Sequence, residues 1–225
     1  MLGLFNKKYD LEYLKLCETN NKPERSNYSI AIIDDEIELP IIKILERHFA
    51  ISHLHDIDSI NQIQGFHIVV CDIKDVGKTF DSKYGGALLV KEILSKYPQK
   101  YVIISSGCVF AVDYNEYFKM ADSYIKKGAD SSEWIAVLDK AISTLNEPFF
   151  LWERTRKFLI HKNVNTSIVN KIEQSYIKSI AKKDSKYLTS SIYSNKSYLS
   201  NEYVSLALNT LIGLTTSIIS NIIIR

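Results

Sequence analysis

Between residues 28 and 146, short apolar runs alternate with stretches in which apolar residues recur every three or four positions. The helical spacing is clearest around Ile41, Leu89 and Leu138. The apolar runs predict strands over 28–34, 50–55, 66–72, 101–105 and 123–127. Strands that alternate with helices at this pitch predict βαβ units on a parallel sheet.

These strands are too continuously apolar for a sheet with one wet face. Runs such as IAII at 30–33 and HIVV at 67–70 are typical of parallel sheets that helices cover on both sides. The pattern therefore predicts an α/β fold with a doubly wound five-stranded parallel sheet and five helices, ending near Asn146.

Polar groups follow several of the predicted strands. Ligands of doubly wound sheets bind beyond the carboxyl ends of the strands. The strands here end at the acidic pair Asp34 and Asp35, at Asp72, at Ser105 and at Lys127. Because these ends meet at one edge of the sheet, we expect three carboxylates, a hydroxyl and an amine to form one site.

This combination suits phosphoryl transfer. Three clustered carboxylates need a counter-charge to remain ionised, and Mg²⁺ prefers oxygen ligands, keeps waters and completes its shell with phosphate. Asp72, at the end of the central strand, is placed to be a nucleophile that forms an aspartyl phosphate. The metal, the Lys127 ammonium and the Ser105 hydroxyl would each cover one phosphoryl oxygen.

The segments IAIIDDE, HIVVCD, YVIISSG and DSYIKKGAD resemble the receiver domain of bacterial two-component response regulators, a flavodoxin-like fold. The resemblance covers residues 28 to 146. It implies that Asp34, Asp35 and Asp72 bind Mg²⁺, that the backbone carbonyl of Lys74 completes the protein ligands, and that Asp72 is the phosphoacceptor.

The resemblance assigns three further roles. Ser105 corresponds to the switch hydroxyl, Tyr124 to the aromatic switch residue and Lys127 to the lysine of the phosphorylation site. The chain would take up phosphate on its own aspartate rather than act as an enzyme on a separate substrate. A sensor histidine kinase or phosphotransfer protein is the implied partner.

The chain departs from the family in three places. The loop 73–84 is longer than usual, Gly128 replaces the proline that commonly follows the lysine, and Ser105 replaces the commoner threonine. The long loop flanks the phosphorylation site, so we expect it to alter kinase fit or phosphate lifetime. Two alternatives stay open: accidental loop acids, and a degenerate receiver that is never phosphorylated.

Other candidate ligands are weaker. His53 and His55, followed by Asp56, are alternate residues of one strand without a third site, so a solvated strand end is favoured over zinc. The three cysteines signal neither a disulfide framework nor a zinc knuckle, and Cys71 is expected to be a small buried residue. Reduced thiols and the lack of a signal-peptide run at the start indicate a cytoplasmic protein.

In the receiver family, phosphorylation remodels the face formed by helix 4, strand 5 and helix 5. The corresponding segments here are 113–120, 123–127 and 131–146. Their aromatic residues suit a docking or homodimer surface, although they could equally cover the sheet: Tyr114, Tyr117, Phe118 and Trp134.

Charge separates the two ends of the chain. From Phe149 onward there are eleven Lys or Arg and four acids, giving +7, whereas the first 148 residues carry 17 basic and 22 acidic groups, giving −5. The chain is therefore divided into an N-terminal extension, a receiver domain and a basic helical region: 1–27, 28–147 and 148–225. The last region forms a small all-α extension, with helices expected near 149–162, 168–180 and 187–193.

The final segment, 204–224, has no charge across 21 residues, which is long enough to cross a membrane. Its polar residues fall on one helical stripe, however, so packing in a bundle or homodimer is favoured over membrane insertion: Asn209, Gly213, Thr216 and Ser220.

Three functions follow from these patterns. The favoured one is a phosphorylation-controlled interaction protein whose helical tail binds a partner or a second copy of the chain. The +7 tail makes a DNA-binding transcription regulator the second, although no helix-turn-helix is recognisable. The third is a membrane-associated signalling subunit anchored through 204–224.

Overall fold

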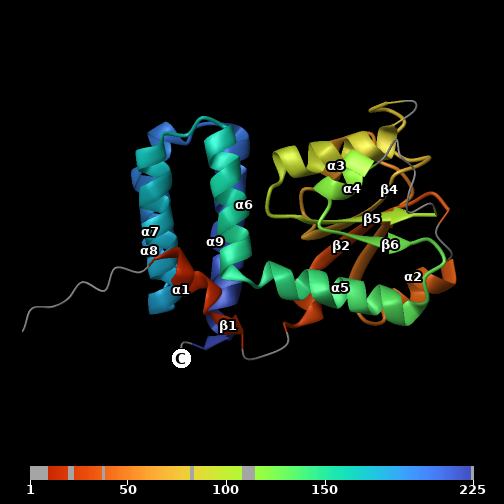
Figure 1. Ribbon diagram of the computed structural model, residues 1–225, viewed down its shortest axis with the longest axis horizontal. Coiled ribbons are helices and arrows are strands. Elements are labelled where there is room, and N and C mark those ends of the chain that lie inside the picture. Colours follow the sequence, from red (N-terminus) through yellow and green to blue (C-terminus); the bar gives the residue numbers. More distant parts are fainter. Residues whose placement is uncertain (1–9, 20–22, 37–38, 82–83, 108–114, 224–225) are drawn as a thin grey trace, which may run out of the picture. The chain divides into compact units, whose positions relative to one another are not determined.

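The computed structural model describes residues 10–19, 23–36, 39–81, 84–107 and 115–223 (Figure 1). The chain divides into two compact units. One is Pro23–Thr144, and the other combines Met1–Lys22 with Leu145–Arg225. The N-terminal segment thus belongs to the same unit as the C-terminal helices, which the sequence did not indicate.

The unit Pro23–Thr144 contains a five-stranded parallel sheet of order β3-β2-β4-β5-β6. This is the flavodoxin-like doubly wound order, so the predicted fold class is confirmed. The observed strands lie within one or two residues of the predicted ones: β2 (Ser29–Ile33), β3 (Ala50–Leu54), β4 (Ile68–Asp72), β5 (Tyr101–Ser106) and β6 (Ser123–Lys126).

Helices cover both faces of this sheet. Figure 1 shows α3 and α4 on one side and α2 and α5 on the other. Every residue of β4 and β5 is buried between them, as the unbroken apolar runs require. The helices are α2 (Leu39–Glu46), α3 (Gly85–Lys96), α4 (Asn115–Met120) and α5 (Ser131–Leu145), preceded by the 3₁₀ helix η1 (Arg25–Asn27).

The prediction of five helices is wrong in one place. Between β3 and β4 the chain forms only a 3₁₀ helix, η2 (Ile60–Ile63). A capping box in which Ser59 and Gln62 bond each other's backbone begins this turn, and Gly65 follows it. Few residues separate Leu54 from Ile68, so a short turn completes the crossover.

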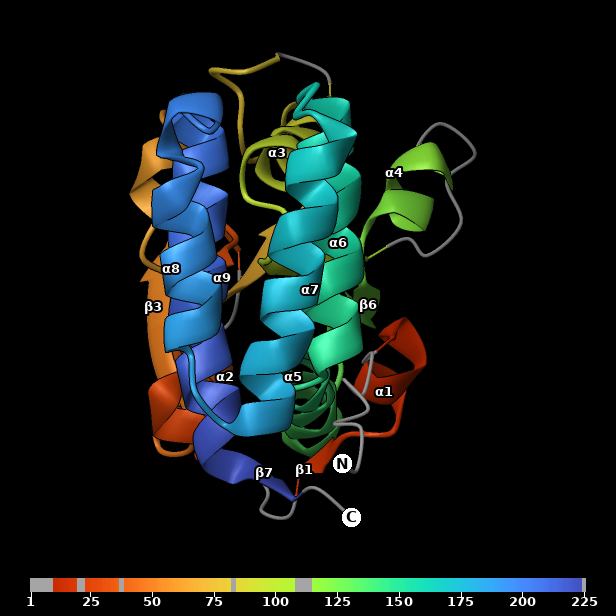
Figure 2. The same cartoon turned by 90° about the vertical axis from the view of Figure 1, so that its left-hand side faces the viewer.

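The second unit is helical. Figure 2 shows its long helices side by side. They are α6 (Pro148–His161), α7 (Thr166–Lys182), α8 (Lys186–Ser194) and α9 (Glu202–Asn221), with the short α1 (Leu11–Lys15) and the 3₁₀ helix η4 (Lys196–Tyr198). A two-residue antiparallel pair that the sequence did not predict joins β1 (Glu18–Thr19) to β7 (Ile222–Ile223).

A buried aromatic pair organises this unit. The rings of Trp152 and Tyr176 stack with their centroids 5.5 Å apart. The Trp152 indole donates to Glu173 at 2.7 Å, and the Tyr176 hydroxyl donates to the Pro148 carbonyl at 2.8 Å. Each polar tip of the pair therefore has a partner, as buried Trp and Tyr require.

Helix α9 is two-sided. Its apolar face packs within the unit through Val204, Ala207, Leu208, Leu211, Leu214 and Ile218. The predicted polar stripe is exposed: Asn209, Gly213, Thr216 and Ser220. By length and composition alone, α9 is also the one described helix that could cross a membrane.

Candidate functional site

The register of the parallel strands brings the predicted site residues to one edge of the sheet. Asp72 lies opposite Ser105 in the β4–β5 ladder. Ile33 lies opposite Cys71, so Asp34 follows at the level of Asp72. The buried strand β2 therefore explains the position of the acids that follow it, because its register with β4 brings Asp34 to the level of Asp72.

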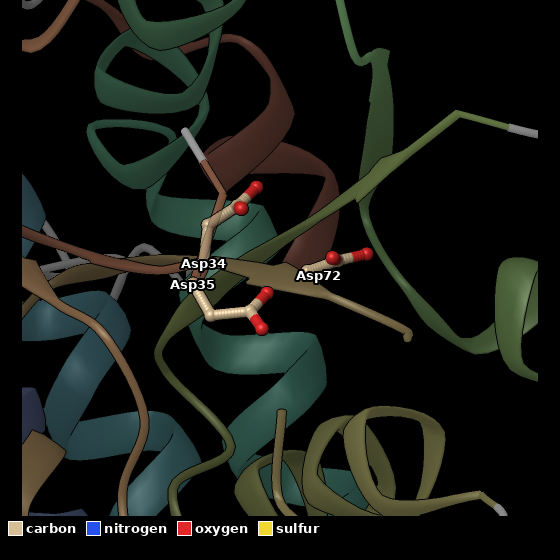
Figure 3. A group of neighbouring side chains, drawn as sticks. All are labelled: Asp34, Asp35 and Asp72. Atoms are coloured by element: carbon tan, nitrogen blue, oxygen red, sulfur yellow. The ribbon is translucent and has the colours of Figure 1, made fainter. Parts of the chain in front are cut away.

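Three aspartates form the centre of the site. One carboxylate oxygen each from Asp34, Asp35 and Asp72 lies within 4.8 Å of the others (Figure 3). Asp34 and Asp72 are each only 1% exposed, whereas Asp35 is exposed. Clustered oxygen donors, two of them buried, fit a hard divalent cation such as Mg²⁺. The geometry thus brings together the side chains predicted to bind it.

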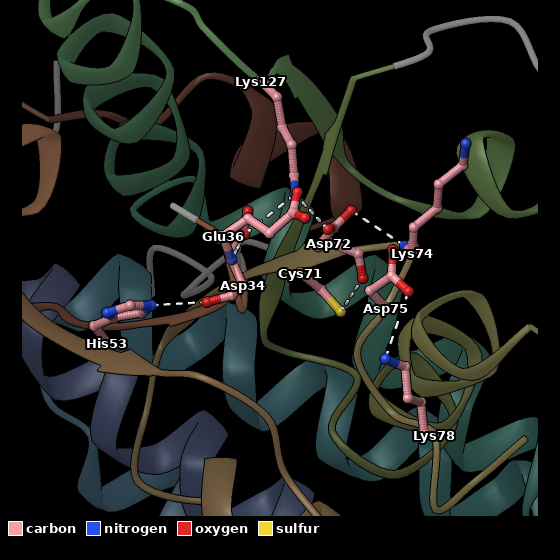
Figure 4. A network of polar contacts seen from close by, with 9 residues as sticks. All are labelled: Asp34, Glu36, His53, Cys71, Asp72, Lys74, Asp75, Lys78 and Lys127. Atoms are coloured by element: carbon pink, nitrogen blue, oxygen red, sulfur yellow. Dashed lines mark hydrogen bonds and ion pairs between the residues drawn. The ribbon is translucent and has the colours of Figure 1, made fainter. Parts of the chain in front are cut away.

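Lys127 supplies the positive charge in this cluster. Its Nζ lies 2.6 Å from Asp72 Oδ2, 3.2 Å from Asp34 Oδ1 and 3.5 Å from Glu36 Oε2 (Figure 4). Glu36 was not predicted as a site residue, although it is the third acid of the DDE run. One ammonium therefore neutralises three carboxylates in part.

Burial and charge act in opposite directions on this pair. Burial raises the pKa of Asp72, and the ion pair with Lys127 and the Lys74 amide, 3.1 Å from Asp72 Oδ1, offset only part of that rise. Burial lowers the pKa of Lys127, but its bonds to Asp72 and Asp34 outweigh burial and raise it above its ordinary value. A cation beside Asp72 would favour its ionised, nucleophilic form.

Ser105 is a buried donor without a partner. Its Oγ makes no hydrogen bond to any part of the chain that the structure describes, and the side chain is 1% exposed. The residue lines a pocket of about 390 Å³. The pocket's other lining residues are Asp34, Glu36, Ile41, Lys127, Gly128, Ala129 and Trp134. An orphaned buried hydroxyl is costly, and a phosphoryl oxygen in this pocket would satisfy it.

The aromatic residues of α4, β6 and α5 divide into two groups. Trp134 is buried and lines the pocket, so it does not belong to an outer docking face. Tyr124 is 59% exposed, and its ring meets Phe118 edge-on at 6.4 Å. Tyr117 is half-buried. Tyr114 lies outside the described residues.

His55 and Asp56 are exposed, as predicted for a solvated strand end, whereas His53 departs from that prediction. His53 is half-buried, and its Nε2 lies 2.8 Å from the Asp34 carbonyl oxygen. The carboxylate of Asp56 accepts from the amides of Gly77 at 2.6 Å and Ile57 at 2.7 Å. Within the described residues, the three aspartates are the only group of His, Cys, Asp or Glu able to hold a metal, so these histidines form no zinc site.

The first part of the long loop after Asp72 is packed against the start of α3. Ile73 and Val76 are buried, and Gly77 takes a left-handed φ of +66°. A Cβ on Gly77 would lie 2.7 Å from the backbone of Gly85, and one on Gly86 would collide with the backbone of Asp72 and Ile73. Glycine at these positions therefore permits two backbone segments to touch.

Cys71 is fully buried, as predicted, and burial raises the pKa of its thiol. It donates to the Asp72 carbonyl at 3.1 Å. Cys17 is half-buried, and Cys108 lies outside the described residues.

No protein-family model and no curated protein matches the chain. Solved structures similar to it include receiver domains. A CheY-like receiver from Methanospirillum hungatei is 19% identical over 52% of this chain and 95% of its own, with a TM-score of 0.45. The receiver domain of NtrX from Brucella abortus is 22% identical over 52% and 99%, with a TM-score of 0.44.

A third structure, the BeF3-activated DrrB receiver domain, is 21% identical over 51% of this chain and 97% of its own, with a TM-score of 0.42. The resemblance predicted from the sequence is thus confirmed as a likeness to receiver domains over about half the chain.

Proposed function

We propose that the unit Pro23–Thr144 is the receiver of a two-component response regulator and that it takes up a phosphoryl group on Asp72. The observation that supports this proposal best is the combination at one pocket of a buried carboxylate, a lysine at 2.6 Å and an orphaned serine hydroxyl. Each of these groups has a role in binding a phosphoryl group.

In the proposed reaction, an oxygen of Asp72 forms a bond to phosphorus while the P–N bond of a phosphohistidine on a partner kinase or phosphotransfer protein breaks. The electron pair leaves with the imidazole nitrogen. Lys127 and the Ser105 hydroxyl each bind one phosphoryl oxygen. Mg²⁺, held by Asp34, Asp35 and Asp72, with the Lys74 carbonyl as a further ligand, would supply positive charge to the transferred group.

The output would be a protein interaction rather than catalysis on a second substrate. A phosphoryl group adds nearly two negative charges and strong acceptors, and Ser105 would bond to it. Tyr124, now exposed, would turn inward to fill the space that Ser105 leaves. Such a change favours one of two packings of the α4–β6–α5 face. The helical unit would then bind a partner protein or a second copy of the chain.

The phosphoacceptor is tested by intact-mass measurement after incubation with Mg²⁺ and an acyl phosphate. The wild-type protein should gain one phosphoryl group, and Asp72→Asn should gain none. Asp75→Asn is the matched control, because Asp75 is exposed and near the site, and among the described residues its ion pair is with Lys78 alone. Labelling of Asp72→Asn at the wild-type level would place the acceptor elsewhere.

The output is tested by light scattering with and without Mg²⁺ and beryllofluoride, a mimic of the aspartyl phosphate. We expect the full chain to change oligomeric mass and Asp72→Asn to keep one mass under both conditions. An unchanged mass in the wild-type protein would exclude phosphorylation-controlled self-association.

Nucleic-acid binding is a second candidate, favoured by one observation on the helical unit. Lys171, Lys178 and Lys182 lie on one exposed face of α7, because residues seven and eleven positions apart share a helix face. The only acid of α7, Glu173, instead bonds Trp152 and Arg156. Affinity for DNA that falls steeply with salt would support this candidate, whereas extraction of the protein only with detergent would support membrane anchoring through α9.

A further inference from the structure

His53 bonds to the backbone between two predicted metal ligands. Its Nε2 lies 2.8 Å from the carbonyl oxygen of Asp34 (Figure 4). A carbonyl oxygen can only accept, so Nε2 carries a proton and donates it. The acceptor belongs to the peptide group that joins Asp34 to Asp35. Fixing this peptide therefore restricts how the two carboxylates are directed.

His53 comes from a different strand than the ligands it supports. It lies in β3, the edge strand, next to β2 in the parallel ladder. The ring of His55 packs against it with the centroids 4.4 Å apart. His53 is half-buried, whereas His55 is exposed. The contact with His55 and the bond to Asp34 both limit rotation of the His53 ring.

Asp56, just beyond β3, fixes the segment that follows Asp72, on the side of the site away from Asp34 and Asp35. Asp56 accepts from the Gly77 amide at 2.6 Å, and the segment from Asp72 to Gly77 contains Lys74, whose carbonyl is the remaining predicted ligand. The left-handed φ values of Asp75 and Gly77, +60° and +66°, turn this segment back toward α3. One carboxylate therefore anchors the turn that carries Lys74.

We propose that His53 and Asp56 are positioning residues that set the spacing of the metal ligands on the two sides of the site. The proposal rests on the proposed function, since it concerns the same cation. Neither residue belongs to the group of carboxylates that would bind the cation. Each acts through one backbone group, the Asp34 carbonyl for His53 and the Gly77 amide for Asp56.

Comparing the binding of Mg²⁺ with that of the larger Ca²⁺ tests whether these residues set the ligand spacing. Mg²⁺ demands near-ideal octahedral geometry at short distances, whereas Ca²⁺ accepts longer and more variable ones. Loosening the ligands should therefore weaken Mg²⁺ binding more than Ca²⁺ binding. A loss of fold stability without a positioning role would leave the affinities of the folded protein unchanged.

The experiment is calorimetric titration of the full-length chain with Mg²⁺ and with Ca²⁺. His53→Phe keeps a ring but removes the donor, and we expect its Mg²⁺ dissociation constant to rise about tenfold, the usual effect of losing a group that orients a metal ligand. His53→Gln restores an amide donor and should recover most of the affinity. His55→Phe, the matched control, should bind like the wild-type protein.

Asp56 is tested in the same way. Asp56→Ala removes both acceptors and should weaken Mg²⁺ binding about tenfold, while Asp56→Asn keeps one acceptor oxygen and should lose less. Asp58→Ala, at an exposed position two residues later, is the control. Amide hydrogen exchange without metal should quicken at 34–36 in His53→Phe and at 73–77 in Asp56→Ala.

Three results would overturn the proposal: wild-type Mg²⁺ affinity in both His53→Phe and Asp56→Ala, equal losses for Mg²⁺ and Ca²⁺, or equal effects in the control variants. Failure of the proposed function itself looks different. In that case the wild-type protein would bind no Mg²⁺, or would bind it as well after Asp72→Asn.

Discussion

The ammonium nitrogen of Lys127 lies 2.6 Å from Oδ2 of Asp72, although Asp72 ends β4 and Lys127 follows β6. The lysine is one-quarter exposed and the aspartate is buried. Water therefore reaches Lys127 but not Asp72. When no metal is bound, the ionised form of Asp72 is stabilised mainly by this lysine.

Replacing Lys127 by Met should separate stability from metal binding. Without metal, the buried carboxylates lose their counter-charge, and the free energy of unfolding should fall by about 2 kcal/mol. Mg²⁺ should then stabilise the variant more than the wild-type protein, because the metal becomes the only counter-charge. Urea unfolding with and without Mg²⁺ measures both effects. Lys126→Met, at the exposed neighbouring position of β6, should behave like the wild-type protein.

Replacing Ser105 by Ala should leave the resting protein intact. The hydroxyl is buried and has no partner among the described residues, so its removal should not lower the free energy of unfolding. Beryllofluoride binding should weaken, because one acceptor on the ligand loses its donor. Ser105→Thr, which keeps the hydroxyl, should restore that binding. A clear loss of stability in Ser105→Ala would show that the hydroxyl is bonded in the resting state.

The sequence predicted the sheet and the side chains at its edge because both depend on local patterns. Each strand is a run of apolar residues, and each predicted site residue follows such a run, so parallel register alone brings Asp34, Asp72 and Ser105 together. The structure adds the contacts, which are between residues distant in sequence.

The features that the sequence did not predict all depend on contacts between residues distant in the chain. The bond of His53 to Asp34 and that of Asp56 to Gly77 join residues 19 and 21 positions apart, and no periodicity marks them. The sequence left open whether Trp134 lies on a docking surface or covers the sheet, because the helical pattern does not show which face meets the pocket. The pairing of β1 with β7 joins the two ends of the chain, which local patterns cannot reveal.

Gly86→Ala should test whether the loop after Asp72 is rigidly packed. The added Cβ would collide with the backbone of Asp72 and Ile73, and backbone cannot move aside as a side chain can. We expect the free energy of unfolding to fall by about 1–3 kcal/mol, the usual cost of overpacking. Gly65→Ala is the control, since nothing lies within 4 Å of its added Cβ. Equal stability of the two variants would mean that the loop yields easily.

Lys100 should make stability depend on pH. Burial lowers its pKa from the ordinary 10.5 to about 7, while Nζ donates to the carbonyls of Gln64, at 2.9 Å, and Phe66. Between these two pKa values the unfolded chain holds a proton that the folded protein has released. The unfolded state then binds more protons, so the free energy of unfolding should rise as pH increases through this window.

Urea unfolding at a series of pH values between about 7 and 10.5 measures how the free energy of unfolding changes with pH. Lys100→Met removes the titrating group, so its curve should lack the rise that the wild-type protein shows. Lys91→Met, at an exposed position of α3, should keep it. A rise that persists in Lys100→Met would have to come from other groups.

Helix α9 offers a choice between a packed helix and a membrane span. Leu211 is fully buried in the helical unit, and Asn209, two residues earlier, is exposed. If the helix packs as observed, Leu211→Asp buries an unpaired charge and should lower the free energy of unfolding by roughly 3 kcal/mol or more. Asn209→Asp should change it by less than about 0.5 kcal/mol.

A membrane span would respond differently, because lipid penalises an aspartate at either position by about 3 kcal/mol. Trp152 lies in the same unit as α9, so its fluorescence in a Trp134→Phe background reports unfolding of that unit alone. Membrane fractionation of both variants completes the test. Loss of membrane association in Asn209→Asp, with unchanged unfolding in Leu211→Asp, would mean that lipid rather than the bundle covers the apolar face of α9.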